Sequence, residues 1–255
     1  MLWQKAWFET RWRFLVGFAV LVLLAAGNVF EYPDVAKLRP AIDRIDTGNG
    51  MIGRAIRNAI EVQRDYRGYV WFQWVRQNLT QTWTLFAVLL GSAGLVTTGA
   101  RRATVFTLSL PVARRRMLGV HAATGVAELL VLAFVPSLVF PLMSPAIGQT
   151  YSFGTTLVHA TCMFVAGSVF FTLTLLLSTV FTDMWRPLLL ACLFAVVVAI
   201  AEQVFVDAPL GIFRTMTAET YFRTGALPWV GLLTSAAVSL GLLYIAAANF
   251  AARDI

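Results

Sequence analysis

Six long runs of apolar residues constrain the fold of this chain more than any other feature. About 20 residues of helix cross the roughly 30 Å hydrocarbon layer of a bilayer. A helix also pairs its backbone polar groups within one segment, as lipid requires. The runs cover roughly 14–30, 83–100, 117–140, 154–182, 187–206 and 227–250. The sequence therefore predicts an all-α integral membrane protein with six transmembrane helices, which form a single transmembrane domain over residues 1–255.

Charge supports this interpretation. Only 13% of the residues are charged, about half the share in soluble domains. The formal net charge of +7 is explained by basic residues that attract anionic membrane lipid. It therefore indicates a lipid partner and no nucleic acid.

Residues 1–13 interleave tryptophans with basic residues before the first apolar run. This pattern is typical of a helix that lies in the headgroup layer. We expect an interfacial helix that continues into the first span. A cleaved signal peptide, which shares the basic front and short apolar core, is the alternative.

Basic residues in short loops mark the cytoplasmic side of a membrane. They occur near the N-terminus, in the 101–116 connector, after the fourth run and near the C-terminus, whereas the 141–153 connector has none. The long 31–82 segment also carries many basic residues, partly offset by acids. The counts predict a multi-pass protein of the cytoplasmic (inner or plasma) membrane, with both termini in the cytoplasm.

Two segments outside the spans have their own patterns. Within 31–82, "MIGRAIRNAIEVQRDY" has helical apolar spacing with one polar face, which predicts a helical extracytoplasmic cap. The 207–226 segment is too broken by proline and glycine to span and too apolar for a free loop. We expect two short helices that re-enter the outer leaflet before the sixth span.

The motifs in the sequence argue against catalysis, nucleotide binding and metal binding by this chain. "GNGMIG" at 48–53 matches G-x-G-x-x-G but lacks the βαβ context that a dinucleotide site needs. The sequence contains no P-loop, no H-E-x-x-H and no cysteine pair that suggests a metal. We expect no catalytic residue, no metal and no cofactor here, so that any ATP and Mg²⁺ would be bound by another chain.

Glu128 lies near the middle of the third run, and His121 lies two helical turns earlier on the same face. A charge at such depth costs a few kcal/mol or more. Glu128 is therefore neutral, paired or beside a wet cavity. The pair is a candidate intramembrane polar site, as a relay or as a structural hydrogen bond.

The connector "ARRATVFTLSLPVARRRMLG" at 100–119 has an ordered series of apolar, proline and basic residues. Pro111 suits the first turn of a helix that would run into the third span. Phe106, Leu108 and Leu110 offer contact surface upstream of it, and Arg114, Arg115 and Arg116 follow. The connector lies within a 62-residue interval, 66–127, without any acidic residue. Anchoring topology needs charge alone and does not explain this order.

"LSLPVARRRMLG" resembles a segment of ABC transporter permeases of the ABC-2 exporter type. The six-span layout, "LLSTVFTDMWRP" after the fourth span and "FAARDI" at the C-terminus agree with that resemblance. It implies that the 101–116 segment is a cytoplasmic coupling helix that docks on a separate ATPase. The residues implicated by position are Leu108, Ser109, Leu110, Pro111, Val112, Arg114 and Arg115.

The chain departs from that family just before the motif. Family members have acidic residues there, whereas this chain has Arg102, Ala103, Thr104 and Val105. Any salt bridge that the family makes from those acids has no counterpart here, and the ATPase surface would differ in charge.

The resemblance implies a permease that exports a hydrophobic or amphipathic substrate through a cavity shared by two permease copies. Spans one, two and five would lie near the shared path, and two ATPase subunits would bind ATP and Mg²⁺. The second permease is a copy of this chain or a related chain. Two alternatives stay open: an ATP-independent secondary transporter or channel that uses Glu128, and a non-transporting membrane scaffold or sensor subunit.

Overall fold

The structure, a computed structural model, describes residues 2–42, 50–92, 114–181, 183–205 and 211–252. These residues form helices and connections without a β-strand. Five helical segments are long and apolar enough to cross a membrane: Ala6–Leu38, Arg116–Ile147, Phe153–Val180, Trp185–Val204 and Trp229–Ala252. The chain is an all-α, multi-pass membrane protein, as the sequence predicts.

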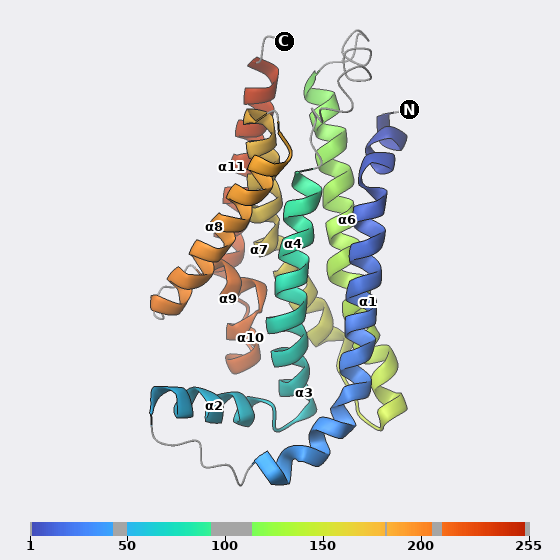
Figure 1. Cartoon of the computed structure of the whole chain (residues 1–255), viewed down its shortest axis with the longest axis vertical. Helices are drawn as coiled ribbons and strands as arrows, with labels where there is room; N and C mark the ends of the chain where they lie inside the picture. The colour runs from blue at the N-terminus through green and yellow to red at the C-terminus, as the bar shows by residue number, and fades with distance from the viewer. Residues whose placement is uncertain (1, 43–49, 93–113, 182, 206–210, 253–255) are drawn as a thin grey trace.

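Helix α1 (Leu2–Ile42) is one uninterrupted helix of 41 residues. The predicted interfacial segment and the first span therefore belong to the same helix, which continues 12 residues beyond position 30. Its last turns bend out of the line of the helix and pass below α2 (Figure 1). This stretch contains Pro33 and Pro40, and prolines kink helices because they lack an N–H and clash with the preceding turn.

The predicted 31–82 cap divides into three structural parts. The end of α1 comes first, and α2 (Met51–Val62) then lies across the end of the bundle (Figure 1). The third part starts a continuous helical run made of α3 (Tyr66–Tyr69), the π-helix η1 (Val70–Leu79) and α4 (Thr80–Gly91). Residues 66–82 thus begin the helix that also contains the start of the second predicted span.

A tight turn joins α2 to α3. The Asp65 side chain accepts a hydrogen bond from the Gly68 N–H at 2.9 Å and caps α3. A Cβ on Gly68 would lie 1.7 Å from the Val62 carbonyl oxygen, so only glycine fits this close approach.

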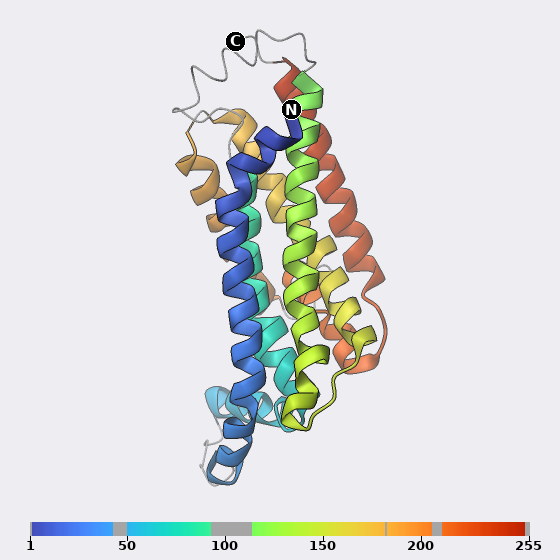
Figure 2. The ribbon, with the colours of Figure 1, turned by 90° about the vertical axis from the view of Figure 1, so that its right-hand side faces the viewer.

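Two long helices follow the 93–113 connector. Helix α6 (Arg114–Met143) packs along α1, as Figure 2 shows, and ends in a short 3₁₀ turn, η3 (Ser144–Ile147). Helix α7 (Phe153–Val180) lies at the centre and packs against α4, α6, α8, α9 and α11. Its neighbour α8 (Trp185–Val204) leans away from the bundle (Figure 1).

The 207–226 segment contains two short helices, α9 (Ile212–Met216) and α10 (Glu219–Thr224). Helix α11 (Trp229–Ala252) then returns along α7. The first turn of α1 and the last turn of α11 lie at the same end of the bundle (Figure 1). We call this the termini end, and the end near α2 the far end.

Candidate functional site

Most of the predicted coupling segment lies outside the described residues. This applies to Phe106, Leu108, Ser109, Leu110, Pro111 and Val112. Arg114 and Arg115 form the first turn of α6, and Arg116 is exposed just after them. The described helices show where the segment attaches: it follows the end of α4 and precedes α6, at the termini end.

Glu128 is buried between α6 and α1, with 2% of its surface exposed. Its Oε1 lies 2.5 Å from the Thr10 hydroxyl, which also lies 3.2 Å from the Ala6 carbonyl oxygen. Its Oε2 is buried without a hydrogen-bond partner among the described residues. Among the described residues this carboxyl group has few hydrogen-bond donors, and burying such a group in lipid is costly. The Thr10 hydroxyl is the donor in reach of Glu128 Oε1 and of the Ala6 carbonyl oxygen, and it joins α1 to α6 at this depth.

His121 is also buried and lies nearer the start of α6. It makes no hydrogen bond to Glu128, because seven residues of helix separate their backbones by about 10 Å. Arg13 of α1 is close enough to His121 to interact with it electrostatically. The structure thus places both predicted polar residues near α1 and does not join them directly.

Arg13, one of the basic residues near the N-terminus, is a central residue of this region. Its Nη1 donates to the Leu89 carbonyl oxygen at 2.7 Å, and its Nη2 donates to the Met184 sulfur at 3.0 Å. One side chain therefore links α1 to the last turn of α4 and to the residue before α8. An arginine at the start of an apolar run was the available signal, but its partners come from distant parts of the sequence.

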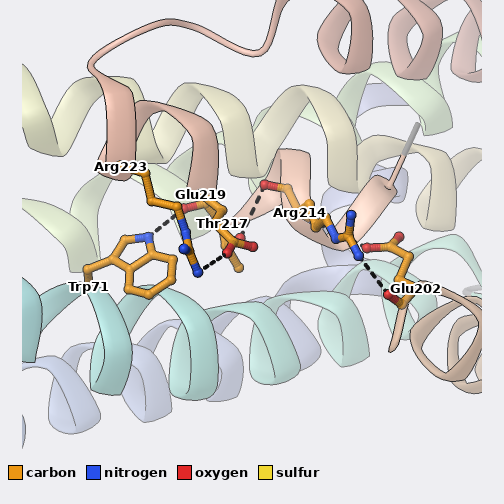
Figure 3. A network of polar contacts seen from close by, with 6 residues as sticks. All are labelled: Trp71, Glu202, Arg214, Thr217, Glu219 and Arg223. Atoms are coloured by element: carbon orange, nitrogen blue, oxygen red, sulfur yellow. Dashed lines mark hydrogen bonds and ion pairs between the residues drawn. The ribbon is translucent and has the colours of Figure 1, made fainter. Parts of the chain in front are cut away.

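A second polar network lies toward the far end, where α8, α9 and α10 meet (Figure 3). The Glu202 carboxylate accepts from the backbone N–H groups of Phe213 at 2.9 Å and Arg214 at 3.1 Å. The Arg214 guanidinium donates back to the Glu202 carbonyl oxygen at 2.8 Å. The end of α8 is thereby joined to the start of α9.

Aromatic side chains pack α9 and α10 against the rest of the bundle. Trp71 of η1 stacks on Phe222 of α10, with ring centroids 4.4 Å apart and an interplanar angle of 7°. Its Nε1 donates to the Thr217 carbonyl oxygen at 2.9 Å (Figure 3). The ring of His159, buried in α7, lies edge-on to Tyr221 at 5.8 Å. The α9–α10 pair is thus packed against η1 and α7.

Within the part of the chain that the structure describes, no three His, Cys, Asp or Glu side chains gather as metal ligands. Comparisons with protein-family models, with curated proteins and with solved structures find no match for this chain. The fold and the site therefore define a class, an all-α multi-pass membrane protein with a buried polar cluster at the junction of α1, α4 and α6.

Proposed function

We propose that this chain is the membrane-spanning permease subunit of an ATP-driven transporter of the ABC-2 exporter type. The observation that carries the proposal is the segment "LSLPVARRRMLG" at 108–119. Its position supports the proposal, because α4, which precedes the segment, ends at the termini end, and α6, which follows it, begins there. A soluble ATPase that bound there could pass its motion into two helices at once.

A six-span layout is part of the proposal. The helical run Tyr66–Gly91 extends through the bundle beside the five long apolar helices (Figure 1). With this run as a sixth crossing, both termini fall on one side, in agreement with their common end in the structure. The basic residues of the 101–116 connector support the cytoplasm as that side.

The transport path would lie between two permease copies. Only 11% of the apolar 18-residue stretch of α8 that could cross a membrane is buried within the chain. This helix therefore has an apolar side available to a second copy. We expect a hydrophobic or amphipathic substrate, with ATP and Mg²⁺ bound by two partner ATPase subunits. Cross-linking between Leu193→Cys copies would support this placement, and its failure in the assembled complex would contradict it.

Glu128 favours a second candidate function, an ATP-independent secondary transporter or channel. A buried acid with one oxygen that has no partner in the described part of the chain is suited to gain and lose a proton during transport. Glu128→Gln distinguishes the two functions. Loss of a pH-dependent, ATP-independent flux would favour the second candidate.

The proposal is tested by purifying the chain with ATPase candidates encoded beside its gene. Wild type should co-elute with an active ATPase, whereas Leu110→Asp and Arg114→Glu/Arg115→Glu should lose it because they alter the docking surface. Arg57→Glu, a charge reversal on α2 at the far end, is the control and should retain the ATPase. Equal binding of the ATPase by all variants would contradict a docking role and leave the arginines with the role of a topology anchor.

A further inference from the structure

Two side chains of α1 bond to the helices that flank the connector. Thr10 and Arg13 are three residues apart and therefore lie on one face of α1. Thr10 bonds to Glu128 of α6, and Arg13 bonds to the Leu89 carbonyl oxygen of α4. Helix α4 leads into the connector and α6 leads out of it.

The bond to α4 lies at the very end of that helix. Leu89 is in the last turn, where carbonyl groups lack helical partners. Its oxygen accepts from Arg13 and, at 3.0 Å, from the Ser92 hydroxyl. A guanidinium at a helix C-terminus is favoured both by charge-assisted hydrogen bonding and by the helix dipole. The position of α1 is therefore coupled to the last turn before the connector.

The same guanidinium reaches the start of α8. Met184 is the residue before α8, and its sulfur accepts from Nη2. Because a guanidinium is planar and its donors have fixed directions, the two acceptors are held at a fixed relative position. Arg13 thus joins α4 and α8 at the termini end.

The bond to α6 lies deeper. Glu128 is 14 residues into α6, roughly 21 Å from its start. Thr10 and Glu128 are both almost fully buried, so a relative shift of α1 and α6 would separate a buried carboxyl group from its hydrogen-bond partner. Such a shift is unfavourable.

We propose that Thr10 and Arg13 form a clamp that makes α4, α6 and α8 move as one body at the end where the connector attaches. The clamp deepens the proposed function, which supplies the motion that it would transmit. It assigns a positioning role to Arg13, Thr10 and Met184, and none of them needs to touch a substrate or the ATPase.

Spin-label distances test the clamp in the full chain. Labels are introduced at exposed positions, Leu85→Cys on α4 and Leu189→Cys on α8, in a background with Cys162→Ala and Cys192→Ala. Labelled chains are diluted with unlabelled ones so that the distances report one copy. Wild type should give a narrow distance distribution, and Arg13→Met should broaden it. Arg11→Met is the matched control, because the ring contacts of Arg11 are to Phe8 and Trp12 of its own helix.

Milder variants separate the parts of the clamp and remain informative if Arg13→Met fails to fold. Met184→Leu keeps the side-chain volume and should broaden the α4–α8 distribution alone. Thr10→Val should broaden the distribution between Leu85→Cys and Leu130→Cys, which reports α4 and α6, and Thr10→Ser should restore it. A merely structural role would lower the melting temperature and leave all these widths unchanged, which would overturn the proposal.

The test separates the clamp from the proposed function. The widths can be measured in the chain alone, so they test the clamp even if no ATPase binds. In the complex with ATPase, ATP and vanadate should leave the α4–α8 distance narrow in wild type, and the distribution should spread in Arg13→Met. Wild-type widths in every variant of an ATPase-bound complex would refute the clamp while the permease function stands.

Discussion

Helices α7 and α8 follow one another in the sequence and are both apolar enough to cross a membrane, but they are held in different ways. In α7, 61% of the apolar stretch that could cross a membrane is buried within the chain, whereas in α8 the buried share is 11%. Packing along its whole length fixes α7. Helix α8 packs on α7 and α4 along one narrow side, and its polar contacts lie near its two ends, with Arg13 at Met184 and the α9 backbone at Glu202.

Residue size explains the difference. The buried residues of α7 include two alanines, one glycine, one serine and several threonines, and small residues allow helices to approach closely in a membrane. In α8 the buried residues are Pro187 and Ala191, and its leucines and valines are largely exposed. Hydropathy therefore identifies both helices as spans, whereas the distribution of small residues identifies the central one.

Gly167→Leu should have the largest effect. A Cβ on Gly167 would lie 2.2 Å from Cζ3 of Trp83, and that ring is fully buried with its Nε1 bonded to the Leu129 carbonyl oxygen at 3.1 Å. Overpacking without room to relax costs about 3 kcal/mol. We expect little folded protein by size-exclusion chromatography.

Gly241→Leu on α11 is the matched control, because no described atom lies within 4 Å of an added Cβ there. It should give wild-type yield. An equally low yield would mean that added bulk in any span, rather than packing of α7, causes the defect.

Leu175→Ala compared with Leu193→Ala tests the contrast directly. Leu175 of α7 is fully buried and Leu193 of α8 is 59% exposed. We expect Leu175→Ala to cost about 2 kcal/mol, near the lower end of the range for soluble cores, because lipid removes the water-transfer contribution. Leu193→Ala should leave the thermal midpoint of the dispersed chain unchanged. Equal midpoints for the two variants would contradict the comparison.

Glu202→Gln should loosen the far end of α8. The amide keeps one acceptor and turns its NH₂ group toward a backbone donor. We therefore expect the free energy of unfolding to fall by about 1 kcal/mol. Hydrogen exchange at the Phe213 and Arg214 amides should become faster. Glu219→Gln is the control, because the Glu219–Arg223 ion pair is partly exposed and such pairs contribute little. Unchanged exchange in Glu202→Gln would show that α8 is not held there.

Ser168→Ala should have the smallest effect. The Ser168 hydroxyl lies 2.9 Å from the Ser239 hydroxyl and joins α7 to α11. Hydrogen bonds between membrane helices contribute about 0.6 kcal/mol on average, so the thermal midpoint should fall slightly. Thr161→Val removes a hydroxyl that bonds within α7 and should change it less. A large effect of Ser168→Ala would show that polar contacts also dominate the stability of α7.

The sequence predicted the membrane class because apolar runs of sufficient length have no other stable form in lipid. It could not predict the partners of Glu128 or Arg13, since these depend on which faces of α1, α4 and α6 meet. It also placed residues 66–82 in a cap, whereas they form the first turns of the helix that continues into α4. Aromatic and charged residues there resemble an interface, and burial by α10 becomes visible only in three dimensions. The six-span count and the coupling segment stay predictions.

The way α8 is held has a consequence for sequence variation. Phe194 of α8 packs edge-on to Phe170 of α7, but at the exposed leucine, isoleucine and valine positions of α8 exchanges among these residues should disturb little of the packing among the described residues. Those positions are free to drift between homologues. Met184 and Glu202, at its two ends, bear the contacts and should vary less. Conservation along the exposed side of α8 would therefore record selection imposed by another molecule, and its pattern would outline where that molecule sits.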